Sequence, residues 1–260
     1  MVHAIPKSGF ARTYLIEEDE GLMAVDVGSI GAAQEIETYC TGVLKRPLQD
    51  IRFITATHFH IDHIGGIGTL LRKCSPETRV LFHPFVKEYL AGSRELSPMK
   101  NWMKGLLPTM IASCSNIGKL SHLTFESLSG VPLSITRNRH YLPYEAWIGY
   151  FDARHLPRYR IGFGDWEVIV TPGHTEDSIS FYSDGMKELI CGDLIIGGKD
   201  GSGHLNRFCW NEDLIGQTYS VLCEIIQPRI IYPSHGGIIA DDENAFRKVA
   251  LFTEIKGVKT

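Results

Sequence analysis

One short segment carries four potential metal ligands: Thr57-His58-Phe59-His60-Ile61-Asp62-His63. It follows a predicted strand and precedes the glycine-rich start of a predicted helix. Side chains alternate in an extended chain, so His58 and His60 point to the same side. A helical turn directly afterwards would project Asp62 and His63 from its first residues. Imidazole and carboxylate bind zinc, manganese and iron, so the segment can direct ligands at two neighbouring points.

Three more potential ligands lie downstream, each where a predicted strand gives way to a loop. They are His174 after Thr171-Pro172-Gly173, Asp193 after Cys191-Gly192, and His235 after Tyr232-Pro233-Ser234. Functional groups are often placed on such loops because the strands beneath them are rigid. Each residue alone could be an ordinary turn residue, but together with the first segment they predict one shared site.

Short apolar runs indicate the elements around these ligands. Hairpins and strand–helix–strand units both occur, so we expect mixed sheets with helices outside. The predicted strands cover residues 13–16, 22–25, 51–55, 79–82, 159–163, 166–171, 178–182, 188–191 and 229–232. The predicted helices cover 32–45, 64–73, 241–255 and a segment that Asn211 caps and that runs to about Ile226.

Residues 84–157 differ from the rest of the chain, with few strand signals and many methionine and aromatic side chains. We favour a small core of their own for these side chains. The alternative is a substrate lid or a homodimer contact. Within this segment, Arg139 is a candidate for binding an anionic substrate group, and a solvated loop is the alternative.

Composition limits the class of protein. The 260 residues have a net charge of −4 and 43% hydrophobic residues, as expected for one globular domain over 1–260. The mild acidity argues against nucleic acid as a partner, and the chain lacks an apolar run long enough for a membrane span. Six cysteines without CxxC spacing indicate reduced thiols, and no secretory signal is visible, so we expect a cytoplasmic protein that acts on a small molecule.

The combined motifs resemble those of the metallo-β-lactamase-fold hydrolase superfamily. They are His58-x-His60-x-Asp62-His63, Gly173-His174, Gly192-Asp193, Ser234-His235-Gly236 and the earlier Ala24-Val25-Asp26-Val27-Gly28. The resemblance implies an α+β fold: a four-layer αββα sandwich of two mixed β-sheets. Residues 84–157 would be a helical insertion between its halves. Ser234 departs from the usual pattern, which has glycine there.

The same resemblance implies a site for two divalent metal ions, zinc in the first place, with manganese or iron as alternatives. His58, His60 and His174 would hold one ion. Asp62, His63 and His235 would hold the second, and Asp193 would bridge the two. Asp26 would orient the ligands from behind, with a turn-capping role as the alternative.

Two ions about 3.5–4 Å apart can share a hydroxide at neutral pH, which attacks a carbonyl carbon or a phosphorus. We therefore expect a hydrolase of a small thioester, lactone or other carboxylic ester, in which Asp62 and Asp193 also orient the hydroxide and relay its proton. His204 is a candidate donor to the developing oxyanion, with an exposed loop histidine as the alternative. A phosphodiesterase with the same metals is the first alternative. An iron-dependent oxygenase and a non-catalytic regulator are further ones.

The ligand set distinguishes branches of the superfamily. Zinc β-lactamases of the commonest type have cysteine where Asp193 stands, and Cys191 is interpreted as a core thiol on the opposite side of a strand. The glyoxalase II-like branch keeps all seven ligands. Its thioesterases add a C-terminal helical domain for glutathione, which has no counterpart in the residues after His235.

Overall fold

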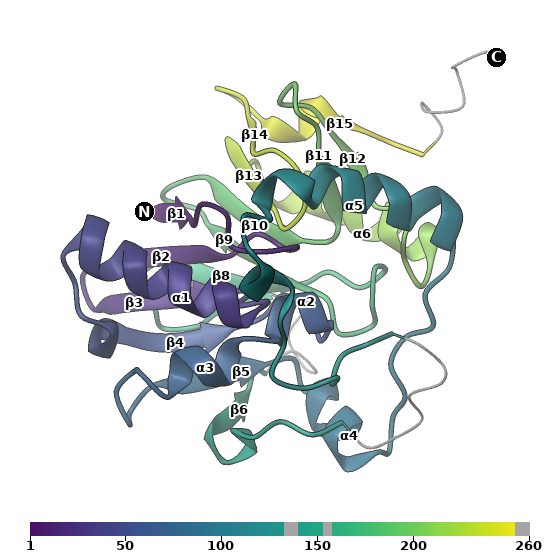
Figure 1. Cartoon of the computed structure of the whole chain (residues 1–260). Helices are drawn as coiled ribbons and strands as arrows, with labels where there is room; N and C mark the ends of the chain where they lie inside the picture. Colours follow the sequence, from purple (N-terminus) through teal and green to yellow (C-terminus); the bar gives the residue numbers. More distant parts are fainter. Residues whose placement is uncertain (133–139, 153–157, 253–260) are drawn as a thin grey trace.

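Two six-stranded mixed sheets form the centre of the structure, a computed structural model that describes residues 1–132, 140–152 and 158–252 (Figure 1). The first sheet has the strand order β1 (Val2–Ala4), β2 (Tyr14–Glu18), β3 (Gly21–Val25), β4 (Ile51–Thr55), β5 (Arg79–Phe82) and β6 (Ile148–Tyr150). Strands β1 to β3 pair antiparallel, and β3 to β6 pair parallel.

The second sheet has the order β14 (Ile239–Ala240), β13 (Ile230–Pro233), β10 (Glu188–Gly192), β9 (Ile179–Ser183), β8 (Trp166–Val170) and β7 (Arg158–Arg160). In it β10 and β13 are parallel, and the other pairs are antiparallel. A small third sheet contains β11 (Ile195–Gly197), β12 (Gly203–Leu205) and β15 (Val249–Ala250).

Helices cover the outer faces of both large sheets (Figure 1). The α-helices are α1 (Ile30–Tyr39), α2 (Ile61–Ile64), α3 (Ile67–Leu71), α4 (Phe85–Ala91), α5 (Leu107–Ser113) and α6 (Glu212–Ile225). Short π-helices lie at Cys40–Leu44 and Trp102–Leu106. Short 3-10 helices lie at Leu48–Asp50, Cys114–Asn116, Leu120–Leu123, Glu145–Trp147 and Ala245–Lys248. None of the helices in the described parts of the chain has the length and hydropathy that a membrane span needs.

Alternation along the strands separates three apolar cores and so confirms the four layers. On β3, Leu22 and Ala24 face the helices, whereas Met23 faces the second sheet. On β10, Ile190 lies between the sheets, and Cys191 packs in the core beneath α6. Cys191 is therefore a buried core thiol, as predicted.

The predicted helix over 241–255 is wrong for the residues that the structure describes. Asp241 Oδ1 accepts hydrogen bonds from the backbone N–H groups of Glu243 and Asn244, which closes a turn instead. The chain then pairs Val249 with Gly203, so a strand of the third sheet replaces the last helical turns. Local capping and β-pairing together override the apolar spacing of this segment.

The other predicted elements are present, with differences in their bounds. The strand expected over 159–163 shares only its first two residues with β7, which ends at Arg160. Asn211 caps α6 by accepting from Leu214 N at 3.1 Å, as expected. The helix expected over 64–73 is divided into α2 and α3, and the helix expected over 32–45 ends its α-helical part at Tyr39.

Residues 84–157 are not a separate body. Strand β6 completes the edge of the first sheet, and the buried side chains of Leu142 and Tyr144 join the core of that sheet. Among the described residues, none of the three apolar cores is confined to this segment. The expectation of a small core of its own is therefore wrong: Leu142 and Tyr144 pack on the first sheet, and other aromatic and methionine side chains of the segment are 41–66% exposed, namely Trp102, Met110, Tyr141 and Trp147.

Two glycines allow the loop after β3 to pack against the segment that carries the ligands. A Cβ on Gly28 would lie 1.7 Å from the carbonyl oxygen of Asp62. A Cβ on Gly66 would lie 1.9 Å from the carbonyl oxygen of Ser29. Any side chain at these positions would push α2 away from β3.

We therefore predict that Gly28→Ala lowers the free energy of unfolding by about 1–3 kcal/mol through overpacking. Urea denaturation of the metal-free protein measures it. The matched control is Gly216→Ala on α6, where an added Cβ meets no atom within 4 Å. The control should leave stability unchanged or raise it by up to about 1 kcal/mol. Equal stability of Gly28→Ala and the unmodified protein would show that this contact is not a constraint.

Candidate metal centre

Three histidine rings converge on one point at the end of β4. The Nε2 atom of His58 lies 2.9 Å from Nδ1 of His60, and Nε2 of His174 lies 3.2 Å from each of these two atoms. All three side chains are buried. Ligand nitrogens on a tetrahedral zinc ion, with bonds of about 2.0–2.1 Å, are about 3.3 Å apart, so these three atoms have the spacing of a metal-binding face.

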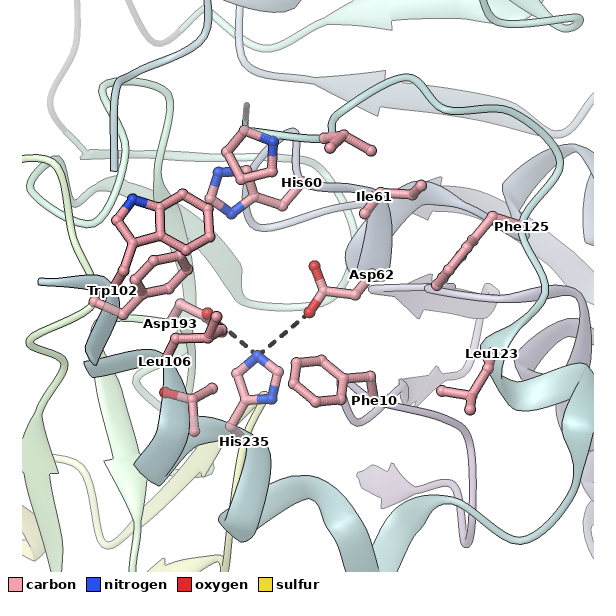
Figure 2. A pocket seen from close by; sticks show the side chains of 14 residues that line it. Phe10, His60, Ile61, Asp62, Trp102, Leu106, Leu123, Phe125, Asp193 and His235 are labelled. Carbon is pink, nitrogen blue, oxygen red and sulfur yellow. Dashed lines mark ion pairs between the residues drawn. The ribbon is translucent and has the colours of Figure 1, made fainter. Parts of the chain in front are cut away.

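A second set of ligands lies beside the first. His235 Nε2 is 3.5 Å from Asp62 Oδ2, and His63 Nε2 is 3.7 Å from the same oxygen. Figure 2 shows the carboxylates of Asp62 and Asp193 directed at the ring of His235. The structure thus brings Asp62, His63 and His235 together as a group that could hold a metal ion.

Asp193 lies between the two sets. Its Oδ1 is 3.4 Å from His63 Nε2, and its Oδ2 is 3.4 Å from His174 Nε2 and 3.2 Å from His235 Nε2. One carboxylate therefore contacts histidines of both groups. This is the position that a bridging ligand needs.

Unpartnered buried atoms show that the residues fit metal ions. His63 Nε2 and Asp193 Oδ1 are both buried, and neither has a hydrogen-bond partner among the described atoms. Buried polar atoms normally have a partner, because leaving one without a partner costs about 1–3 kcal/mol. A cation between them would satisfy both. The histidine and aspartate clusters therefore fit a dinuclear site.

The protonation of the two sets differs. Burial and the neighbouring imidazoles lower the pKa of His58 and of His60 well below the usual value, so their nitrogens are free to bind. Burial also acts to lower the pKa of His63, but the surrounding carboxylates, Asp26 foremost, outweigh it and raise this pKa to about 10. A proton on His63 therefore balances the carboxylates, and a bound cation would displace it.

Asp26 holds His63 from behind. Its Oδ2 is 3.0 Å from His63 Nδ1, so the other ring nitrogen faces the cluster. Asp26 also accepts hydrogen bonds from Thr57 N at 2.7 Å and from Ser234 Oγ at 2.8 Å. Its φ of +60° is a left-handed conformation that aspartate tolerates better than most residues. The hydroxyl of Ser234, where the related pattern has glycine, thus adds a donor to this carboxylate.

His174 is oriented by the backbone. Its Nδ1 lies 2.7 Å from the carbonyl oxygen of Phe208. A carbonyl oxygen only accepts, so Nδ1 carries the proton and Nε2 presents a lone pair to the cluster.

Ser113, at the end of α5, orients His235. Its Oγ donates to Thr109 O at 2.9 Å and lies 2.7 Å from His235 Nδ1. A hydroxyl has one hydrogen, and the carbonyl of Thr109 receives it. Ser113 must therefore accept from His235 Nδ1, which directs Nε2 at Asp62 and Asp193. Burial acts to lower the pKa of His235, but these carboxylates outweigh it and raise this pKa, and a bound cation would displace the proton from Nε2.

The family comparison agrees with this geometry. A model of the metallo-beta-lactamase superfamily matches residues 8–253. The chain belongs to the metallo-β-lactamase superfamily. Its two mixed sheets, its layers and its cluster of seven side chains are those expected from the resemblance of its motifs.

Individual relatives share 25–28% of aligned residues with the chain. The chain is 28% identical over 189 residues to "Probable metallo-hydrolase YflN" of Bacillus subtilis, which covers 72% of this chain and 61% of that protein. It is 25% identical over 236 residues to "Probable metallo-hydrolase YqjP" of the same organism, covering 86% and 66%. The chain thus spans less than two thirds of the length of either relative.

Solved structures of low identity show the same fold. The protein TTHA1623, described in a di-iron-bound form, superposes with a TM-score of 0.54 at 18% identity, covering 88% of this chain and 89% of that one. At this identity the likeness supports the fold alone.

A cavity of about 360 Å³ opens beside the ligands. His60, Asp62, Asp193 and His235 are among the residues that line it (Figure 2). Both predicted catalytic carboxylates, Asp62 and Asp193, thus border a space that a small molecule could enter. Their catalytic roles stay predictions.

The two predicted substrate residues have different outcomes. Arg139 lies outside the described residues. His204 lies on β12 with its Nδ1 3.1 Å from Leu205 O, and it is not among the described residues that line the cavity. A substrate contact by His204 stays a prediction.

Sequence reasoning missed Ser113 and the carbonyl of Phe208. Ser113 is 122 positions from His235, and no local pattern links the two. A hydroxyl residue within the segment 84–157 is its only sequence signal, and it is too common to identify Ser113.

We predict that Ser113→Ala weakens binding of one of two zinc ions about 10–100-fold, the range usual for loss of a residue that orients a metal ligand. Competition with a chromophoric chelator measures both affinities, and ¹⁵N NMR reports the His235 tautomer. The matched control is Ser220→Ala on α6, whose hydroxyl makes the same type of bond to Gly216 O at 3.0 Å with no histidine beside it. Two affinities equal to those of the unmodified protein would contradict the assigned role of Ser113.

Proposed function

We propose that the chain is a dinuclear metal-dependent hydrolase of small carboxylic esters, including thioesters and lactones. The observation that carries the proposal is the position of Asp193, whose two oxygens lie 3.2–3.4 Å from nitrogens of both histidine groups. Ligand sets that share one carboxylate would keep two ions within the roughly 3.5–4 Å at which both act on one substrate.

Two divalent ions bound there would lower the pKa of a shared water to near neutrality and polarise the attacked carbonyl group. Asp62 would supply the proton acceptor beside these ions. Asp62 is the most exposed of the seven side chains, at 18% against at most 5% for Asp193 and the histidines paired with it. It lines the cavity, so it can hold the nucleophilic water in position and accept its proton.

An ester suits the cavity better than a phosphodiester does. A phosphodiester carries a negative charge throughout, and none of the described residues that line the cavity is a lysine or arginine. The ions would offset the charge at the reacting centre of either substrate, so the preference rests on the rest of the lining, which is largely apolar and suits an uncharged molecule. We therefore propose the ester as substrate and retain the phosphodiester as the alternative that the assay decides.

We propose zinc as the native metal. Five imidazoles and two carboxylates are a donor set that zinc accepts readily, and iron binds to similar sets. The description of TTHA1623 names iron in that protein. Elemental analysis of protein purified without added metal separates the two metals.

Removal of metal should abolish activity. Protein treated with a chelator should lose hydrolysis of a thioester, a p-nitrophenyl ester and an acyl lactone, and two equivalents of zinc should restore it. His58→Ala and Asp193→Ala should each lower kcat/KM at least about 100-fold, since each removes a ligand. His3→Ala is the control, because His3 on β1 pairs with Glu17 of β2 and Tyr39 of α1 and is not one of the seven clustered side chains.

Two results would overturn this proposal. Full activity of both ligand variants on the best substrate would show that the assigned residues do not form the active site. Faster hydrolysis of bis(p-nitrophenyl) phosphate than of every ester would replace the esterase by the phosphodiesterase.

A further inference from the structure

Apart from the metal ligands, the described lining forms a largely apolar wall of the cavity. Six of its side chains come from the segment between β5 and β6: Trp102, Leu106, Leu123, Phe125, Val131 and Pro132. Figure 2 shows Trp102, Leu106, Leu123 and Phe125 arranged around the space that the carboxylates of Asp62 and Asp193 border. A substrate whose reacting bond reaches the ligands must therefore lay its remaining atoms against this wall.

Packing holds parts of this wall in place. The rings of Trp102 and Phe208 meet edge to face with centroids 4.9 Å apart, and Trp102 Nε1 donates to Met99 O at 3.0 Å. Phe10 meets the ring of His235 edge to face at 5.1 Å. Such contacts favour a preformed cavity over one that opens only around a ligand.

The wall offers few groups to a charged substrate. Thr109 is the polar residue of the lining that is not one of the seven ligands, and its hydroxyl already donates to Gly105 O at 3.0 Å. The described lining contains carboxylates and imidazoles at the metal site and no lysine or arginine elsewhere. A charged group placed against the apolar wall would lose its hydration without gaining a partner.

We propose that this cavity, which we call the acyl pocket, binds an uncharged apolar acyl chain of the ester substrate, and that Leu106 is part of the wall that the chain contacts. The inference rests on the proposed function and adds the class of substrate. The pocket of about 360 Å³ lies at the lower end of the range for small-molecule sites. It therefore suits a chain of several carbons.

If the acyl pocket binds the chain, kcat/KM should rise with chain length in a series of esters. Each methylene group buried in it contributes about 0.8 kcal/mol, which corresponds to about a fourfold rise in kcat/KM. The rise should continue from acetyl through butyryl to hexanoyl esters. It should end where the chain is longer than the pocket.

The first experiment measures kcat/KM of zinc-loaded protein for these three p-nitrophenyl esters. Leu106→Asp places a charge on the apolar wall and should lower the hexanoyl-to-acetyl ratio at least tenfold. The matched control is Leu107→Asp, the same substitution at the next residue, which is 58% exposed and lies outside the cavity lining. It should leave the ratio unchanged. A ratio near one in the unmodified protein, or equal ratios in the two variants, would overturn the inference.

A second pair of esters tests the charge of the substrate. A six-carbon acyl ester with a terminal carboxylate should be hydrolysed at least tenfold less efficiently than the hexanoyl ester. Equal or better hydrolysis of the charged ester would show that a cation reaches the pocket, and the uncharged class would be wrong.

A binding measurement separates this inference from the proposed hydrolase. Methyl ketones of increasing chain length are uncharged and cannot be hydrolysed, and calorimetry gives their Kd on the zinc-loaded protein. The Kd should fall about fourfold per methylene in the unmodified protein and in Leu107→Asp, and much less in Leu106→Asp. Such binding without hydrolysis of any ester would uphold the acyl pocket while the proposed function fails. Hydrolysis of esters without dependence on chain length would do the reverse.

Discussion

The carboxylate of Asp193 has one oxygen near His63 and the other near His174 and His235, and the surrounding structure depends on this contact. A carboxylate buried among imidazoles is costly unless charges and hydrogen bonds compensate it. The nearby histidines, above all His235, outweigh the burial and lower the pKa of Asp193. The site is thus built to hold negative charge in the interior, which is what a buried pair of cations requires.

The fold supplies this arrangement by bringing the ends of strands from both sheets together. His58 and His60 follow β4 of the first sheet, whereas His174, Asp193 and His235 follow β8, β10 and β13 of the second. Asp26 orients His63, and Ser113 orients His235, each through the ring nitrogen that points away from the cluster. The metal site therefore lies at the junction of the two sheets, and both sheets must pack correctly for it to form.

The clustering of these seven side chains could be predicted because each lies in a short motif at a strand end, and their roles as metal ligands stay predictions. Most strands could be predicted for the same reason, since alternation and turn residues are local signals. The end of the chain could not, because Asp241 closes a turn and Val249 pairs with a strand more than 40 positions away. Ser113 could not either, because its contact with His235 forms only after the second sheet and α5 have met. The segment between β5 and β6 has a weak local pattern, and only the packed structure shows that its apolar side chains line the cavity beside the ligands.

Anomalous X-ray diffraction at the zinc edge from crystals of the zinc-loaded protein tests the central claim most directly. The account predicts two peaks about 3.5–4 Å apart, one beside His58, His60 and His174 and the other beside Asp62, His63 and His235. Asp193 should lie between them with one oxygen toward each. A single peak, or two peaks that do not share Asp193, would contradict a dinuclear centre.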